Sequence, residues 1–178
     1  MELKYIEELN SIVDKLVRQF GCTAEVDTDF AYYHDDKVIT WSPFIMEKAD
    51  RYFHEYVDEE YPYIEADVFL WSIFHEIGHH MTYNKFTAER LVECRKEKDL
   101  LAEALEEADT GGSLERLCYR KYFTVDDEFM ATAWAADYME SNADIVAEFW
   151  LNFVDEFDKF LSYNSVVKNS EETFSEKI

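Results

Sequence analysis

The chain has 178 residues, of which 48% are hydrophobic, so it is long enough to form one domain with a sizeable core. Only four glycines and two prolines leave little room for the turns of an all-β fold. The net charge of −23 disfavours direct binding of nucleic-acid phosphates, and no apolar run is long enough to cross a membrane.

The cysteines and the first residues indicate the compartment. Cys22, Cys94 and Cys118 are an odd number without a CxxC pair, which predicts neither a disulfide framework nor a zinc ribbon. The opening MELKYIEELNSIVDKLV alternates charged and apolar positions, unlike the apolar block of a signal peptide. We therefore expect reduced thiols in a cytoplasmic protein.

The chain begins with a predicted helix and a predicted hairpin. Apolar residues recur at helical spacing over residues 2–20, and Gly21 supplies the stop. Two β-rich runs, roughly 23–33 and 37–41, flank the turn sequence His34-Asp35-Asp36. We expect His34 to be exposed in that turn, and we expect the small sheet to pack on a helix.

Two further helices are predicted next. Residues 44–60 form the first, in which His54 is a surface or partly buried residue rather than a ligand. The second begins near Pro62, which suits a first helical position. At about 100° per residue, its apolar residues form one stripe: Ala66, Leu70, Ile73 and Ile77, flanked by Phe69 and Phe74.

The second of these helices carries the motif HEIGH, an HExxH pattern. Its spacing places His75 and His79 one turn apart on the face opposite the apolar stripe, where both can bind a single Zn²⁺. Glu76 is placed to act as general base on a water at the open position of the metal. His80 points about 100° away from His79, so we do not expect it to share the metal.

Residues 85–123 form a predicted helical insertion between the two halves of the site. A long charged helix over 85–109 ends at Gly111-Gly112, and a short second helix follows. The second part holds the densest basic cluster, Arg116, Arg120 and Lys121. The insertion is interpreted as a lid, as a substrate platform, or as a helical hairpin without a further role.

Thr124 is the expected cap of the next helix, with Asp127 as the carboxylate of a capping box. One face of that helix carries small residues beside one carboxylate: Glu128, Ala131, Thr132 and Ala135, followed by Met139. Small residues allow close packing against Gly78, so Glu128 is the predicted third ligand. Asp127 is the nearest competitor, and the alternative role for Glu128 is compensation of the helix dipole.

An aromatic-rich stripe over residues 143–161 predicts a closing helix, and residues 162–178 are polar and are expected to be a disordered tail. The fold class is therefore α+β, mostly helical, with a short antiparallel hairpin packed on the HExxH helix. Residues 1–161 are interpreted as one domain with the insertion at about 85–123.

HEIGHH followed by E-x-x-A-x-x-W-A-A-x-Y-M resembles the ImmA/IrrE family of bacterial and phage metallopeptidases, whose members carry HExGH and then E-x-x-A-N-x-F-A-x-x-L-L. Glu128 matches the leading glutamate, Ala131 the alanine, and Trp134 the phenylalanine. Thr132 replaces the usual asparagine. The stretch between the two motifs is also longer than is usual in the family.

The resemblance implies a small zincin-like domain over roughly residues 20–140 and a zinc-dependent peptidase of narrow specificity. Such enzymes cleave a regulatory protein, for instance a transcriptional repressor that controls a mobile element. It implies Zn²⁺ held by His75, His79 and Glu128, with Glu76 as the catalytic base. A tyrosine hydroxyl that helps to polarise the scissile carbonyl would come from Tyr83 or Tyr138.

Two other functions agree with the same sequence. An acidic zincin-fold binding protein, acting as a decoy or inhibitor that imitates DNA, would explain the charge of −23. Its binding would weaken steeply as the ionic strength rises. A metal-dependent hydrolase of a non-peptide amide would use the same site residues as the peptidase.

Overall fold

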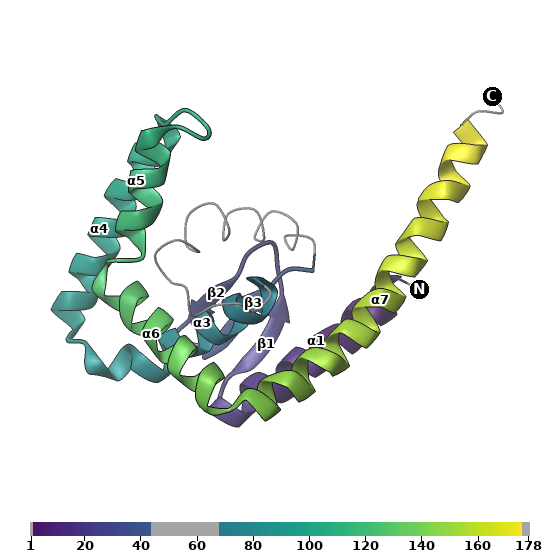
Figure 1. Ribbon diagram of the computed structural model, residues 1–178, viewed down its shortest axis with the longest axis horizontal. Coiled ribbons are helices and arrows are strands. Elements are labelled where there is room, and N and C mark those ends of the chain that lie inside the picture. The colour runs from purple at the N-terminus through teal and green to yellow at the C-terminus, as the bar shows by residue number, and fades with distance from the viewer. Residues whose placement is uncertain (1, 44–67, 176–178) are drawn as a thin grey trace.

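The computed structural model describes residues 2–43 and 68–175, which are mostly helical and include one small mixed sheet (Figure 1). The predicted α+β class is confirmed. The predicted helix over 44–60, with His54, and the helix start at Pro62 lie outside the described residues. Within these described ranges, no helix combines the length and the apolar character needed to span a membrane.

The first helix, α1 (Glu2–Val17), continues into a 3-10 turn, Arg18–Phe20. Gly21 ends it with a φ of 87°, and its backbone N–H donates to the carbonyl of Arg18. The predicted helix and its glycine stop are therefore confirmed. The buried residues of α1 form its inner face: Leu9, Val13, Leu16 and Val17.

The sheet has three strands, β1 (Thr23–Val26), β2 (Ala31–Tyr33) and β3 (Val38–Trp41), in the order β1-β3-β2. β2 and β3 form the predicted antiparallel hairpin. The prediction of one continuous run over 23–33 was wrong, because β1 pairs with β3 in parallel. The run breaks where the Asp27 carboxylate accepts from the backbone N–H of Thr28, a local bond that competes with strand pairing.

Side chains of α1 attach this helix to the sheet. Asn10 donates to the carbonyl of Ala24 and accepts from the indole N–H of Trp41, at 3.2 and 2.8 Å. The Asp14 carboxylate accepts from the backbone N–H of Ala24 at 3.0 Å. These bonds satisfy polar groups at the edge of the core, and they fix the helix relative to β1 and β3.

The helix α3 (Val68–Thr82) carries HExxH and packs against the hairpin. Within the described residues its predicted apolar stripe is buried, since Leu70, Ile73 and Ile77 are none of them more than 5% exposed, and Ala66 lies outside the described residues. Phe69 contacts Trp41 of β3 in an edge-to-face arrangement. The sheet and the core therefore cover one side of α3 and leave the histidine side for the site.

The predicted insertion forms two helices, α4 (Ala88–Glu106) and α5 (Ser113–Tyr122), which lie together at one end of the molecule (Figure 1). Thr87 caps α4 by accepting from the backbone N–H of Arg90. The turn between the helices contains Gly111 with a φ of 76°, a conformation that favours glycine. The predicted break at this glycine pair is confirmed.

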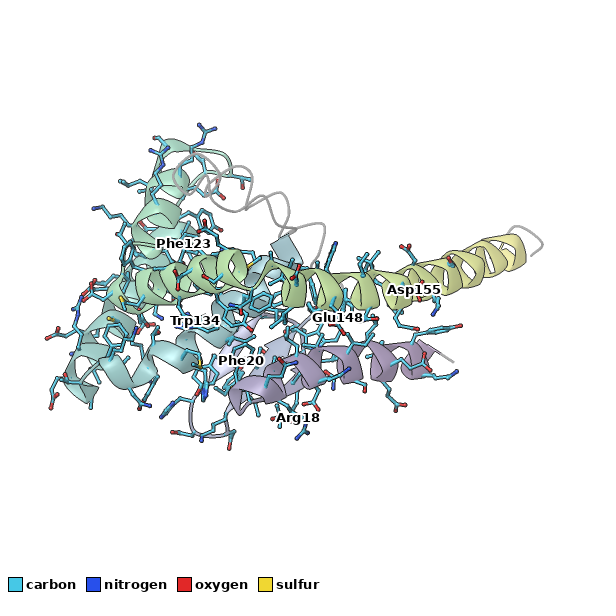
Figure 2. All side chains as sticks on the ribbon, turned by 60° about the horizontal axis from the view of Figure 1, so that its bottom comes forward. Arg18, Phe20, Phe123, Trp134, Glu148 and Asp155 are labelled. Carbon is cyan, nitrogen blue, oxygen red and sulfur yellow. The ribbon has the colours of Figure 1, made fainter. Side chains whose placement is uncertain are left out.

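The helix α6 (Asp126–Ser141) follows α5 and crosses α3. The predicted cap was wrong: the Thr124 hydroxyl donates to the carbonyl of Lys121, and Val125 stands at the cap position without a side-chain bond. Phe20, in the 3-10 turn that follows α1, contacts Trp134 of α6, and their ring centroids are 5.7 Å apart. Figure 2 labels both side chains.

The last helix, α7 (Ala143–Ser175), lies beside α1 (Figure 1). Its inner residues are buried in the core: Phe149, Phe153 and Phe160. The backbone of 162–175 is helical, whereas the sequence assigns these residues to a disordered tail. In the structure, the helix continues beyond the last residues of its aromatic stripe.

Candidate metal centre

The three predicted metal ligands converge at one point between α3 and α6. The Nε2 atom of His75 lies 3.1 Å from Oε2 of Glu128, and the Nε2 atom of His79 lies 3.4 Å from the same oxygen. The two Nε2 atoms are 3.1 Å apart. One ligand atom from each residue lies within 4.8 Å of the others, so this group could hold a metal ion.

The close crossing of α3 and α6 brings these ligands together. Gly78 faces the backbone of Ala131, and a Cβ atom at this glycine would lie 2.4 Å from the Ala131 carbonyl oxygen. Glu128 lies one turn before Ala131 on the same buried face of α6. The sequence prediction that small residues allow this packing is confirmed, and the packing places Glu128 beside the two histidines.

Thr132 contacts the other ring nitrogen of His75. Its Oγ1 atom lies 3.3 Å from Nδ1, and both side chains are buried. If the Nδ1–H group donates to this hydroxyl, the lone pair on Nε2 faces Glu128 and the metal position. The ImmA/IrrE motif has asparagine at the position of Thr132. The threonine hydroxyl also supplies a polar partner for His75.

Asp127, the predicted competitor of Glu128, has a different partner. Its Oδ2 atom lies 2.7 Å from the Nζ atom of Lys98 on α4. The same ammonium group lies 2.7 Å from Oε1 of Glu128. Asp127 is not part of the convergent group. Of the two neighbouring carboxylates, Glu128 is therefore the candidate ligand.

Burial and nearby charges shift the protonation of the ligands. Burial alone would raise the pKa of the Glu128 carboxyl, but hydrogen bonds and charge from His75 and His79 lower it well below its usual range. Burial lowers the pKa of His79, but Glu128 and Glu76 raise it to a net value above the usual one. The anionic site therefore favours a positive charge between these residues.

A cavity of about 710 Å³ borders this group. It is lined by residues from the hairpin, α3, α4, α5 and α6, and Glu76 lies in its wall together with His75 and His79. Glu76 is only 8% exposed. Glu76 therefore lines the same space as the three candidate ligands, and this space is large enough for a substrate.

The predicted tyrosines differ in position. Tyr83 lines the cavity, whereas Tyr138 packs in the core, stacked on Trp134 and Phe74. Tyr122 of α5, which the sequence did not single out, lines the cavity close to Glu128. Burial raises the pKa of its hydroxyl, as do the charges of Glu128 and Glu76, so the hydroxyl keeps its proton.

The two remaining described histidines are not ligands of this group. His80 hydrogen-bonds through Nδ1 to the hydroxyl of Tyr32 at 2.7 Å, which agrees with the prediction that it does not share the metal. His34 was expected to be exposed but is half-buried, because its ring stacks on Tyr83 with centroids 3.2 Å apart. It forms part of the cavity wall.

Two residues from the predicted insertion were missed as parts of the site. Lys98 is one of many charged residues on α4, and nothing in the sequence around it sets it apart from the other charged residues of that helix. Tyr122 stands at the end of a short helix. Their proximity to Glu128 depends on how the pair of helices packs against α6, and periodicity within one helix does not encode that packing.

Comparison with known proteins does not assign this site to a family. Comparisons with protein-family models, with curated proteins and with solved structures give no significant match. We therefore infer function from the residues of the site and their geometry.

Proposed function

We propose that the protein is a zinc-dependent metallopeptidase. The observation that carries this proposal is the convergence of His75, His79 and Glu128 beside a cavity that also contains Glu76. Glu76 belongs to the same motif as the histidines, which gives one helix both the ligands and the base. We infer that cleavage of a peptide bond is the reaction.

The side chains present fit zinc. Two imidazole nitrogens and one carboxylate oxygen are a ligand set found in catalytic zinc sites, where the fourth position is kept for water or substrate. His75 and Glu128 are buried, and Thr132 supports the ring of His75. Supporting contacts of this type keep the ligands oriented for the metal.

Zinc bound there would supply a Lewis acid that polarises a carbonyl and lowers the pKa of water to about 7. Glu76 would accept a proton from the attacking water and pass it to the leaving amine. The protonated hydroxyl of Tyr122 would donate to the oxygen of the scissile carbonyl, where negative charge develops. Trp71 and Phe123 would limit the access of bulk water, since their rings pack on His75.

The resemblance to ImmA/IrrE peptidases supports a zincin-like fold and a protein substrate, such as a transcriptional repressor or another regulatory protein. In that proposal the enzyme acts in the cytoplasm and recognises neither nucleic acid nor a membrane directly. All three cysteines are free and buried, which agrees with a reducing compartment.

The test is cleavage of a peptide library, read by mass spectrometry, with the zinc-loaded full-length protein. We expect cleavage at a restricted set of sites. Glu76→Gln should retain zinc and lose activity by about 100-fold or more, since general bases contribute 10²–10⁴-fold. The peptidase proposal fails if the zinc-loaded protein cleaves no peptide or if Glu76→Gln cleaves as well as the wild type.

A second candidate function is binding by an acidic protein that acts by contact. The net charge of −23 favours it, and exposed acidic residues such as Asp155 lie along α7 (Figure 2). A partner bound through these charges should dissociate as salt is raised, because exposed charges are screened within about 8 Å at 0.15 M ionic strength. Zinc and Glu76 would then be dispensable for function.

A further inference from the structure

The two carboxylate oxygens of Glu128 have different partners. Oε2 faces the Nε2 atoms of His75 and His79, at 3.1 and 3.4 Å. Oε1 lies 2.7 Å from the Nζ atom of Lys98. The carboxylate therefore presents one oxygen toward the metal position and the other toward α4.

Lys98 is held in place by groups besides Glu128. Its Nζ atom also lies 2.7 Å from Oδ2 of Asp127 and 5.9 Å from the ring centroid of Tyr122. Its side chain is 24% exposed, so water screens the contacts less than at an open surface. Asp127 offsets the charge of the ammonium group, which reduces repulsion between Lys98 and a divalent cation.

We propose that Lys98 is a positioning residue of the metal centre, which holds Oε1 of Glu128 so that only Oε2 binds the metal. This inference rests on the metal site of the proposed function. The terminal torsion of a glutamate is soft, so a free carboxylate can turn and bind with both oxygens. A second bond from Glu128 would occupy a position that a catalytic site keeps for water or substrate.

This role of Lys98 makes the helices of the 85–123 insertion part of the site. α4 contacts the first turn of α6 through two sets of ion pairs. Arg90 pairs with Asp126 at 2.8 Å in an exposed setting, and Lys98 pairs with Asp127 and Glu128 in a less exposed one. Only the second set includes a metal ligand. The insertion therefore completes the site from a distant part of the chain.

This arrangement provides a matched control. Lys98→Met keeps a long unbranched side chain and removes its charge, and Arg90→Met removes the exposed ion pair between the same two helices. Lys98→Arg retains a positive charge. All variants are made in the full-length chain, and circular dichroism with thermal unfolding confirms that each is folded.

The measurement is the affinity of each variant for Zn²⁺ alone, by competition with a chromophoric chelator. We expect Lys98→Met to weaken binding by about 10-fold or more, as removal of outer partners of metal ligands does. Arg90→Met should stay near the wild type, and Lys98→Arg should recover part of the loss. Co²⁺ gives a second signal, because its visible absorption bands weaken as the coordination number rises. We expect weaker bands in Lys98→Met.

The outcomes separate the two proposals. If the wild type binds zinc and the Co²⁺ spectrum of Lys98→Met is unchanged, the role of Lys98 is refuted whatever its zinc affinity, while the peptidase proposal stands. An equal loss in Arg90→Met would also refute it, since the effect would then come from the packing of α4. If the wild type binds no metal, both proposals fail.

Discussion

Gly78 of α3 lies directly against the backbone carbonyl of Ala131 of α6, with no room for a side chain between them. A Cβ atom at Gly78 would lie 2.4 Å from that oxygen, closer than non-bonded atoms approach. This contact determines the separation of the two helices that carry the histidines and Glu128. The candidate metal site therefore depends on a residue that has no ligand atom of its own.

Gly78→Ala should destabilise the protein, although alanine is the better helix former by about 1 kcal/mol. We expect a net loss of about 1–3 kcal/mol, because the backbone oxygen of Ala131 cannot move away without separating α6 from α3. Zinc affinity should fall as well. Urea unfolding and chelator competition measure the two effects.

Ala133→Gly, at an exposed position of α6, calibrates the cost of helix propensity alone, about 1 kcal/mol. It should leave zinc affinity unchanged. A Gly78→Ala variant as stable as the wild type, with normal zinc binding, would show that the close crossing is not required.

The Thr132 hydroxyl is expected to fix the ring of His75 through Nδ1. Thr132→Val keeps the shape of the side chain and removes the hydrogen bond, so zinc affinity should fall by about 10-fold. Thr132→Ser keeps the hydroxyl and should bind zinc nearly as well as the wild type. Equal affinities for the valine and serine variants would contradict this role.

Zinc affinity should rise with pH between about pH 6 and pH 8. The pKa of His79 is raised above 6.5, so below that value the metal-free protein carries a proton that zinc must displace. The Glu128 pKa is lowered, so this carboxylate stays ionised over the whole range and contributes no dependence. Chelator competition at several pH values measures the slope, and an affinity independent of pH would contradict the expectation.

The same shift has the opposite effect on the stability of the metal-free protein. Protonated His79 stabilises the fold fully below its unfolded pKa of about 6.5, and this contribution is lost as the pH rises through the raised folded pKa. Metal-free protein should therefore become less stable above pH 6.5, while the zinc-loaded protein should not. His79→Gln should remove this part of the pH dependence measured by urea unfolding.

Tyr122→Phe should lower kcat by about 100-fold if its hydroxyl donates to the developing oxyanion. KM should change little, because the aromatic ring remains in the cavity wall. Tyr138→Phe should have no effect on kcat, since Tyr138 packs in the core against Phe74. Peptide cleavage under saturating substrate separates the two variants, and equal kcat values for all three proteins would exclude Tyr122 from the reaction.

Local periodicity was sufficient for the parts of the site that lie on one helix. The spacing of His75 and His79 places both on the face opposite Ile73 and Ile77, and the structure buries those two isoleucines as expected. The small face of α6 also predicted the contact with Gly78. In both cases the information lies within one or two turns, because a helix has a fixed 3.6-residue repeat.

Tertiary structure decided what depends on contacts between distant segments. Asp127 and Glu128 are adjacent in sequence, and the rotation of α6 against α3 selects Glu128 for the histidines and leaves Asp127 to Lys98. The parallel pairing of β1 with β3 and the arrival of Tyr122 beside Glu128 depend in the same way on how separate elements pack. The sequence by itself determined which residues of α3 and of α6 share a face. Packing determined which residues of the insertion reach that face, because a helical repeat does not specify how a separate pair of helices is placed against it.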